Sequence, residues 1–251
     1  MTLQLTQILA MIFVALLTVA LPLGLMLALR RRSGKWGPFW VGVLIFVVSA
    51  MVLEQVFHTL VFMSPLGPVL QGSLLATALY GGLAAGLFGE TGRLAAFRLL
   101  LRGERAPVTA LAYGAGHGGV EAVLLGGLTM VNNLALAALV GGGAVTDPAV
   151  LAAAETLAAT PAGMFLWAGL ERCSAVALHL ANSVLVFAAV RERRYGLYLL
   201  AILTHAVANF LAVMLSAAVP TAVVELAVLA WSLLTAAMAW RVYRGLPAAE
   251  Q

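Results

Sequence analysis

The amino-acid sequence predicts an all-α, membrane-embedded bundle of about seven transmembrane helices. Apolar residues make up 63% of the 251 residues and the mean hydropathy is +1.04, whereas soluble proteins are about 45–50% apolar. Only 10% of the residues are charged. Because a spanning helix needs about 20 apolar residues, seven spans with short loops account for residues 1–251 as a single transmembrane domain.

The apolar runs place the spans at residues 3–29, 38–63, 69–97, 107–140, 162–190, 196–217 and 220–240. The first run lacks a basic segment before it and a small-residue cleavage site, so we interpret it as a retained span and not a signal peptide. Between the fourth and fifth spans, Asp147 and Pro148 stand in the order of an N-cap and a first helical residue, which predicts a short interfacial helix. Cys173 is the only cysteine and cannot form an intrachain disulfide.

The basic residues indicate how the chain is oriented. They gather in residues 30–35, 98–105, 191–194 and 241–244, each directly after an odd-numbered span, and the connections after even-numbered spans contain no Lys or Arg. The positive-inside rule therefore predicts an outer N-terminus and a cytoplasmic C-terminus in a prokaryotic plasma membrane. The net charge is +4, and the basic residues sit mainly in these short clusters between apolar runs. This pattern is typical of a protein whose partner is the lipid bilayer, and not of a nucleic-acid-binding protein.

Four spans carry ionisable residues at a similar depth. Glu90, His117, His179 and His205 each lie roughly 12–18 Å from the cytoplasmic face at about 1.5 Å per helical residue. An ionisable group costs roughly 2.5–3.5 kcal/mol at the centre of a bilayer, and such residues usually mark a functional site. The sequence therefore predicts that Glu90, His117, His205 and Asn209 converge on one cavity near the midplane that opens toward the cytoplasmic side. Other polar residues, Glu54 and His58, fall in the outer half of their span, and we place them outside this site.

Spacing within each helix suggests side-chain partners. His117 and Glu121, and likewise His205 and Asn209, are four residues apart and share a helix face. A catalytic imidazole needs a partner that fixes its orientation, and Glu121 and Asn209 stand where they can provide it. Four glycines surround His117 in residues 113–121, which predicts open space beside its ring for substrate or water.

Each of these pairs also has a structural interpretation. His117 with Glu121 can clamp two helices together, Glu90 with Arg93 can form a structural ion pair, and polar side chains of this kind hold membrane helices together by hydrogen bonds. Arg172 lies deep enough in its span to need a carboxylate such as Glu171.

In these segments the chain resembles the YhfC-type membrane peptidases, which are similar to the CAAX-prenyl-protease and bacteriocin-processing (CPBP) superfamily. The matching residues run in the order Phe88-Gly-Glu-Thr-Gly-Arg93, Tyr113-Gly-Ala-Gly-His-Gly-Gly-Val-Glu-Ala122, Glu171-Arg172 with His179, and His205-Ala-Val-Ala-Asn209. The resemblance covers most of the third to sixth spans and places a catalytic core at about 69–217.

The resemblance implies an intramembrane endopeptidase that cleaves a membrane-associated protein or peptide. Carried over by position, Glu90 activates water, His117 orients it or shuttles a proton, and His205 with Asn209 polarises the scissile carbonyl. Arg93 then supports Glu90, while Glu121, Glu171 and His179 have supporting positions. Members of the superfamily usually carry two adjacent glutamates, whereas this chain has Gly89-Glu90; if the first glutamate is the essential base, Glu121 or Glu171 has to act instead, or the protein is inactive.

Metal dependence and two rival functions stay open at this stage. The sequence has no His-Glu-x-x-His pattern, yet three histidines and a glutamate at one depth are a set that can hold zinc. Intramembrane His and Glu residues also form proton relays, so a proton-coupled transporter is one rival, although the chain lacks an obvious inverted repeat. A non-catalytic immunity or assembly factor is the other.

Overall fold

The structure, a computed structural model, describes residues 3–143 and 145–247, and helices without any strand make up the ordered elements of this described part. The predicted polytopic helical bundle is therefore confirmed. In chain order the elements are α1 (Leu5–Ser33), α2 (Gly37–Phe46), η1 (Val47–Leu53), α3 (Glu54–Phe62), α4 (Leu66–Gln71), α5 (Leu74–Ala95), η2 (Ala96–Leu100), α6 (Val108–Glu121), η3 (Ala122–Gly127), α7 (Leu128–Gly141), α8 (Pro148–Ala159), α9 (Ala162–Arg191), α10 (Gly196–Ser216) and α11 (Thr221–Gly245).

Six helices of the described part are long and apolar enough to cross a membrane: Leu5–Arg32, Gly37–Met63, Val108–Gly141, Ala162–Arg191, Gly196–Ser216 and Thr221–Gly245. These match six of the seven predicted spans. The remaining predicted span corresponds to α5 and η2, a continuous helix that is diluted by glycines and carries Glu90 and Arg93. The predicted interfacial helix is α8, and the Asp147 carboxylate caps it by accepting from the backbone N–H groups of Ala149 and Val150 at 2.8 and 3.3 Å.

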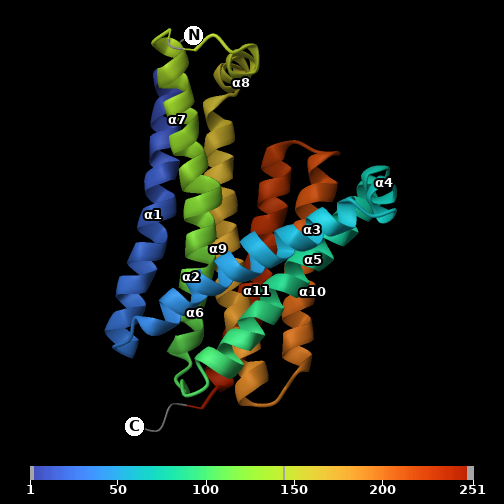
Figure 1. Cartoon of the computed structure of the whole chain (residues 1–251). Helices are drawn as coiled ribbons and strands as arrows, with labels where there is room; N and C mark the ends of the chain where they lie inside the picture. Colours follow the sequence, from blue (N-terminus) through green and yellow to red (C-terminus); the bar gives the residue numbers. More distant parts are fainter. Residues whose placement is uncertain (1–2, 144, 248–251) are drawn as a thin grey trace.

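The helices are arranged around α9, which packs against α1, α6, α10 and α11. Figure 1 shows α1, α7 and α8 together on one side, while α2, α3 and α5 cross the bundle obliquely and lead to α4 on the other side. The closest pairings join α5 with α10, α9 with α11, and α2 with α6. The functional residues predicted from the sequence lie on α5, α6, α9 and α10, so this packing brings their helices together.

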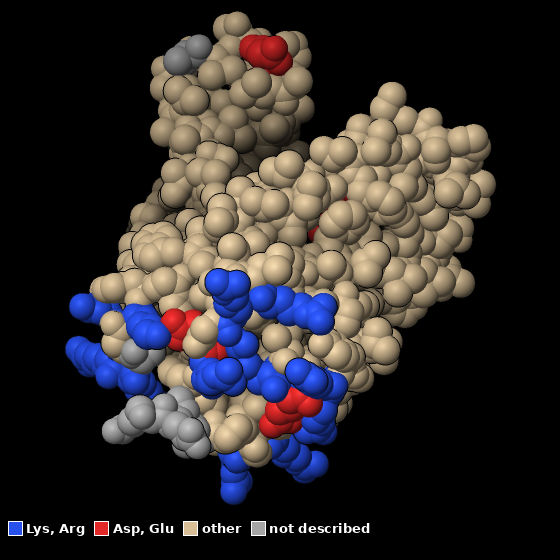
Figure 2. All heavy atoms as spheres, turned by 60° about the horizontal axis from the view of Figure 1, so that its bottom comes forward, with Lys and Arg blue, Asp and Glu red and all other residues tan. Residues whose placement is uncertain are grey.

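The basic side chains gather at one end of the bundle, as predicted. Figure 2 shows Lys and Arg over the end at which α1 and α11 finish. The basic residues stand in the last turns of α1, η2, α9 and α11. At the first of these ends, Gly34 takes a left-handed conformation with φ of 69° and returns its N–H to the Arg30 carbonyl, which stops α1 before the loop.

Three helices widen into π-helical segments next to the centre of the bundle. η1 continues α2 into α3, η2 ends α5, and η3 continues α6 into α7. π-helical turns are rare and occur mostly at functional sites, because they shift the side chains that follow around the helix axis. Here η1 and η3 supply part of the wall of the central cavity described below.

Candidate active site

A cavity of about 440 Å³ lies between α2–η1–α3, α5, α6–η3, α9, α10 and α11. Its polar lining comes from Glu54, Gln55, His117, Glu121, Glu171, Arg172, His179, His205, Asn209 and Ser232. The structure thus brings together six of the eight candidate site residues in one wall, and it leaves Glu90 and Arg93 out of it. The wall also includes residues of η1, α3 and α11, which lie outside the expected core at 69–217.

From the row of histidines, the lining residues of the cavity extend away from the arginine-rich end of the bundle, whereas we predicted an opening toward that end. Along α6 and η3, which begin at the arginine-rich end, the lining residues are His117, Glu121 and Leu125. His117 is 1% exposed, whereas Leu125 is 52% exposed. On the other side of the histidines, Phe97, Tyr113 and Phe187 form a buried aromatic cluster.

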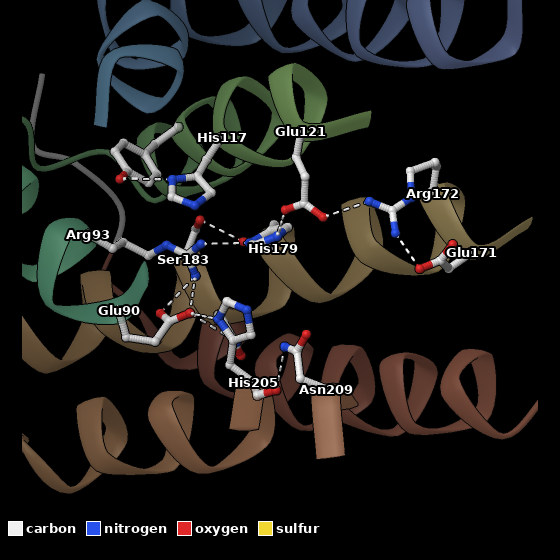
Figure 3. A network of polar contacts seen from close by, with 12 residues as sticks. Glu90, Arg93, His117, Glu121, Glu171, Arg172, His179, Ser183, His205 and Asn209 are labelled. Carbon is white, nitrogen blue, oxygen red and sulfur yellow. Dashed lines mark hydrogen bonds and ion pairs between the residues drawn. The ribbon is translucent and has the colours of Figure 1, made fainter. Parts of the chain in front are cut away.

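Glu90 lies behind His205 as seen from the cavity (Figure 3). Both Glu90 and Arg93 are completely buried, and Arg93 Nη1 donates to the two carboxylate oxygens of Glu90 at 3.1 and 2.8 Å. On the opposite side, Glu90 Oε1 lies 2.9 Å from Nδ1 of His205 and 3.3 Å from Nδ2 of Asn182. Glu90 therefore contacts the cavity only through the His205 ring.

A second chain of polar contacts runs along the other wall (Figure 3). His179 Nε2 lies 2.6 Å from Oε2 of Glu121, whose Oε1 accepts from Arg172 Nη1 at 3.0 Å. Arg172 also forms an ion pair with Glu171. Arg93 joins the two chains, because its Nη2 lies 3.0 Å from Nδ1 of His179. A continuous polar network thus extends from His205 to Glu171.

The partners of the histidines differ from those suggested by spacing. Glu121 contacts His179 on a neighbouring helix, and the nearest polar partner of His117 is the Tyr113 hydroxyl at 3.4 Å. Asn209 donates to the backbone carbonyl of His205 at 3.2 Å and leaves the imidazole to Glu90. The histidines contact residues of other helices because each helix is rotated so that its polar face meets a neighbouring helix. The spacing of residues within one helix does not reveal this rotation.

The glycines around His117 serve close helix packing, and the cavity that its ring lines is not formed by them. A Cβ at Gly116 would lie 1.9 Å from the Phe39 carbonyl oxygen, and one at Gly119 would lie 2.4 Å from Pro22 Cβ. At Gly114 and Gly118 it would meet atoms of α9 within 3.0 Å. His117 itself is 1% exposed, with its ring edge-on to Phe46 and tilted toward His179 at 4.8 Å between ring centroids.

Replacing Gly116 by alanine should therefore strongly destabilise the protein. The new methyl would collide with backbone of α2, which cannot move without shifting the whole helix, so we expect a loss above the 1–3 kcal/mol typical of core overpacking (~3 kcal/mol or more). Thermal unfolding in detergent measures it. Gly81→Ala is the matched control, because a Cβ there meets nothing within 4 Å and alanine is the better helix former. Equal unfolding temperatures for the two variants would contradict the packing role.

Gly89 lies against the ring of His205. A Cβ at this position would stand 3.0 Å from Cε1 and 3.3 Å from Nδ1 of His205, inside the usual contact distance. The ring is held in place from the side by Glu90. Gly89 therefore leaves room for the imidazole to sit against α5.

Glu54 lines the cavity, although we expected it outside the site. It lies 3.3 Å from Nε2 of His58, whose Nδ1 contacts the Tyr80 hydroxyl at 2.7 Å. His58 does not belong to the cavity wall. The difference arises because η1 and α3, the second half of the predicted span 38–63, run obliquely across the bundle (Figure 1). Glu54 at the start of α3 therefore lies next to the cavity.

Several buried polar residues of the site did not stand out in the sequence. Asn182 donates to Glu90 and accepts from Thr204 at 2.9 Å, and Ser183 donates to the His179 carbonyl at 2.7 Å. Tyr113 contacts His117. Uncharged polar residues are common in membrane helices as structural contacts, but the spacing of His179, Asn182 and Ser183 within one turn of α9 was a usable signal.

The fold and the site together define a polytopic membrane protein with a buried centre of histidines and carboxylates. The chain belongs to the YhfC intramembrane metalloprotease family, whose model matches residues 17–230. It is similar to the "Uncharacterized membrane protein YhfC" of Bacillus subtilis (strain 168), with 34% identity over 218 residues that cover 82% of this chain and 84% of the relative. No solved structure matches the chain. By its family, this protein belongs to the general class of intramembrane proteases.

The metal in the family's description does not fit the site as it is arranged. Within residues 3–143 and 145–247, no group of three or more His, Cys, Asp or Glu is placed to hold a metal ion. His179 uses both ring nitrogens, toward Arg93 and Glu121, and the oxygens of Glu121 are bound by His179 and Arg172. The Nε2 atoms of His117 and His205 remain, and among the described residues no carboxylate is placed to join them as a third ligand, whereas a catalytic zinc usually has three protein ligands.

Proposed function

We propose that this protein is an intramembrane endopeptidase that cleaves a membrane-associated protein or peptide with water activated by His205 and Glu90. The observation that carries the proposal is the position of His205 between a buried carboxylate and the cavity. A carboxylate behind an imidazole fixes its orientation and stabilises its positive charge, which makes the opposite ring nitrogen an effective base. His117 and Asn209 line the same cavity and supply further polar contacts.

In the proposed reaction, Nε2 of His205 removes a proton from a water molecule as its oxygen bonds to the scissile carbonyl carbon. The electron pair of the carbonyl moves to its oxygen, which accepts a hydrogen bond from the Asn209 amide. When the carbon–nitrogen bond breaks, the leaving amine takes the proton from Nε2 of His205. Glu90 stabilises the imidazolium between these steps, and His117 orients the water. This assigns Glu90 an indirect role, in keeping with its place behind His205.

The substrate would enter from the side of the histidines away from the arginine-rich end, along which the lining residues of the cavity extend. The cavity is lined by Met51, Leu125 and Ala212 beside the polar groups, which suits an extended peptide whose backbone reaches the histidines. Donors in a site removed from bulk water are worth about 2.7–4 kcal/mol each for an oxyanion. Asn209 is the donor that we assign to this role.

We propose an outer N-terminus and a cytoplasmic C-terminus, supported by the one-sided placement of the basic clusters. A reporter that works only in the cytoplasm should be active when it is fused after Gln251. A reporter that works only outside the cytoplasm should be active when it is fused in the connection before α8. The reverse pattern would contradict the orientation and place the mouth of the cavity on the cytoplasmic side.

The function is tested by proteolysis of candidate membrane peptides in proteoliposomes, with wild type, Glu90→Ala and His117→Ala compared with and without a chelator. We expect cleavage by wild type, insensitivity to the chelator, and loss of cleavage in both variants. Loss of cleavage in the chelator, with recovery when zinc is added, would show that the protein needs a metal and would contradict a reaction carried by His205 and Glu90 alone. Absence of cleavage with a broad peptide set, or full cleavage by both variants, would contradict the proposal.

A further inference from the structure

In the described part of the protein, Arg93 is the side chain that forms hydrogen bonds to both chains of the polar network. Its Nη1 pairs with Glu90 and its Nη2 lies 3.0 Å from Nδ1 of His179. The guanidinium is completely buried and lies between α5 and α9 (Figure 3). An ion pair with Glu90 alone would not require the second contact.

The second contact determines where the proton of His179 resides. A guanidinium has five N–H donors and no acceptor, so Nδ1 of His179 has to accept the hydrogen bond from Arg93. A neutral imidazole with an accepting Nδ1 carries its proton on Nε2. Nε2 points at Oε2 of Glu121, 2.6 Å away, and donates to it. A doubly protonated His179 would set two donors against each other at 3.0 Å.

The first contact, between Arg93 and Glu90, places the proton of His205 on Nδ1, the opposite ring nitrogen from that in His179. Arg93 neutralises Glu90 as a carboxylate, which only accepts hydrogen bonds. Nδ1 of His205 therefore donates to Oε1 of Glu90 at 2.9 Å, and its Nε2 carries a lone pair. That atom makes no hydrogen bond within the described residues, and the ring lines the cavity.

We propose that Arg93 is a positioning residue that sets opposite tautomers on two histidines. It holds His179 as the Nε2-protonated form and, through Glu90, holds His205 as the Nδ1-protonated form. His179 is thereby kept from acting as a base, and His205 turns its unprotonated nitrogen to the cavity. The inference deepens the proposed function and rests on it only in taking His205 as the base; the tautomers themselves follow from the contacts.

The tautomers can be measured without any substrate. Nitrogen NMR of protein labelled with ¹⁵N-histidine in lipid bilayers separates protonated from unprotonated ring nitrogens, and single His→Gln variants assign the signals of the four histidines. In wild type we expect unprotonated Nδ1 at His179 and unprotonated Nε2 at His205. A protonated Nδ1 at His179, or the same tautomer at both residues, would overturn the proposal.

Arginine variants test the cause. In Arg93→Lys a single ammonium replaces two separate donor atoms, so we expect His179 to lose its fixed tautomer and show signals of both forms. Arg172→Lys is the matched control, because Arg172 contacts Glu121, the partner of His179, but contacts no histidine itself. In this variant the His179 spectrum should keep one form. An unchanged His179 spectrum in Arg93→Lys would overturn the role of Arg93. If that variant does not fold, the wild-type spectrum still decides the tautomers.

Failure of this inference differs from failure of the proposed function. Wild-type cleavage together with the wrong tautomers would reject the role of Arg93 and leave the protease intact. The expected tautomers in a protein that cleaves no peptide would keep the positioning role and reject the protease.

Discussion

Replacing His205 by glutamine should lower the rate of peptide cleavage by about 10²–10⁴-fold, the usual contribution of a general base. A glutamine can still donate to Oε1 of Glu90, as Nδ1 of His205 does at 2.9 Å, but it cannot take a proton from water. We therefore expect the loss in the turnover rate with a folded protein. The measurement is single-turnover cleavage in proteoliposomes beside thermal unfolding in detergent.

The matched control for this experiment is His58→Gln. His58 lies in the membrane with a carboxylate and a hydroxyl as neighbours, as the site histidines do, but it stays outside the cavity wall. Its replacement should change cleavage little. Equal losses in the two variants would mean that any intramembrane histidine is needed for structure, and a nearly wild-type His205→Gln would remove His205 from the reaction.

Replacing Glu90 by leucine should both abolish cleavage and destabilise the protein by about 3–5 kcal/mol, the cost of breaking a buried ion pair. The variant leaves the completely buried Arg93 without its carboxylate partner and His205 without its acceptor. Unfolding by heat or denaturant in detergent, followed by circular dichroism, measures the loss of stability.

The double variant Glu90→Leu/Arg93→Met separates the two effects. Exchanging both members of a buried pair for apolar residues is often neutral, so the double variant should regain most of the stability lost in Glu90→Leu. Cleavage should not return, because His205 still lacks the carboxylate. A double variant that cleaves would show that the pair is structural, and one as unstable as the single variant would show that the contact of Arg93 with His179 dominates.

The number and order of the helices could be predicted from the sequence because hydrophobic length and basic clusters are one-dimensional signals. The depth of the histidines could also be predicted, since a helix advances about 1.5 Å per residue whatever it packs against. His117, His179 and His205 accordingly lie in one row, with successive ring centroids 4.8 and 5.2 Å apart.

The partners of these residues depend on the rotation of each helix about its axis, which the sequence does not reveal by spacing alone. Glu121 was assigned to His117 by its position one turn away, yet it contacts His179 on α9. Glycines next to a histidine were equally ambiguous, because a missing Cβ can leave space or admit a neighbouring helix. At Gly116 the carbonyl of Phe39 occupies the position. The placement of Glu54 followed from the oblique course of α3, a tertiary feature.

The small volume of the cavity bears on the supply of water in the proposed reaction. A volume of about 440 Å³ holds on the order of fifteen water molecules at about 30 Å³ each. If peptides are cleaved at His205 as proposed, a bound peptide would displace most of this water. Refilling of the cavity between turnovers would then set an upper limit to the rate, and substrates bulky enough to fill it completely would act as inhibitors.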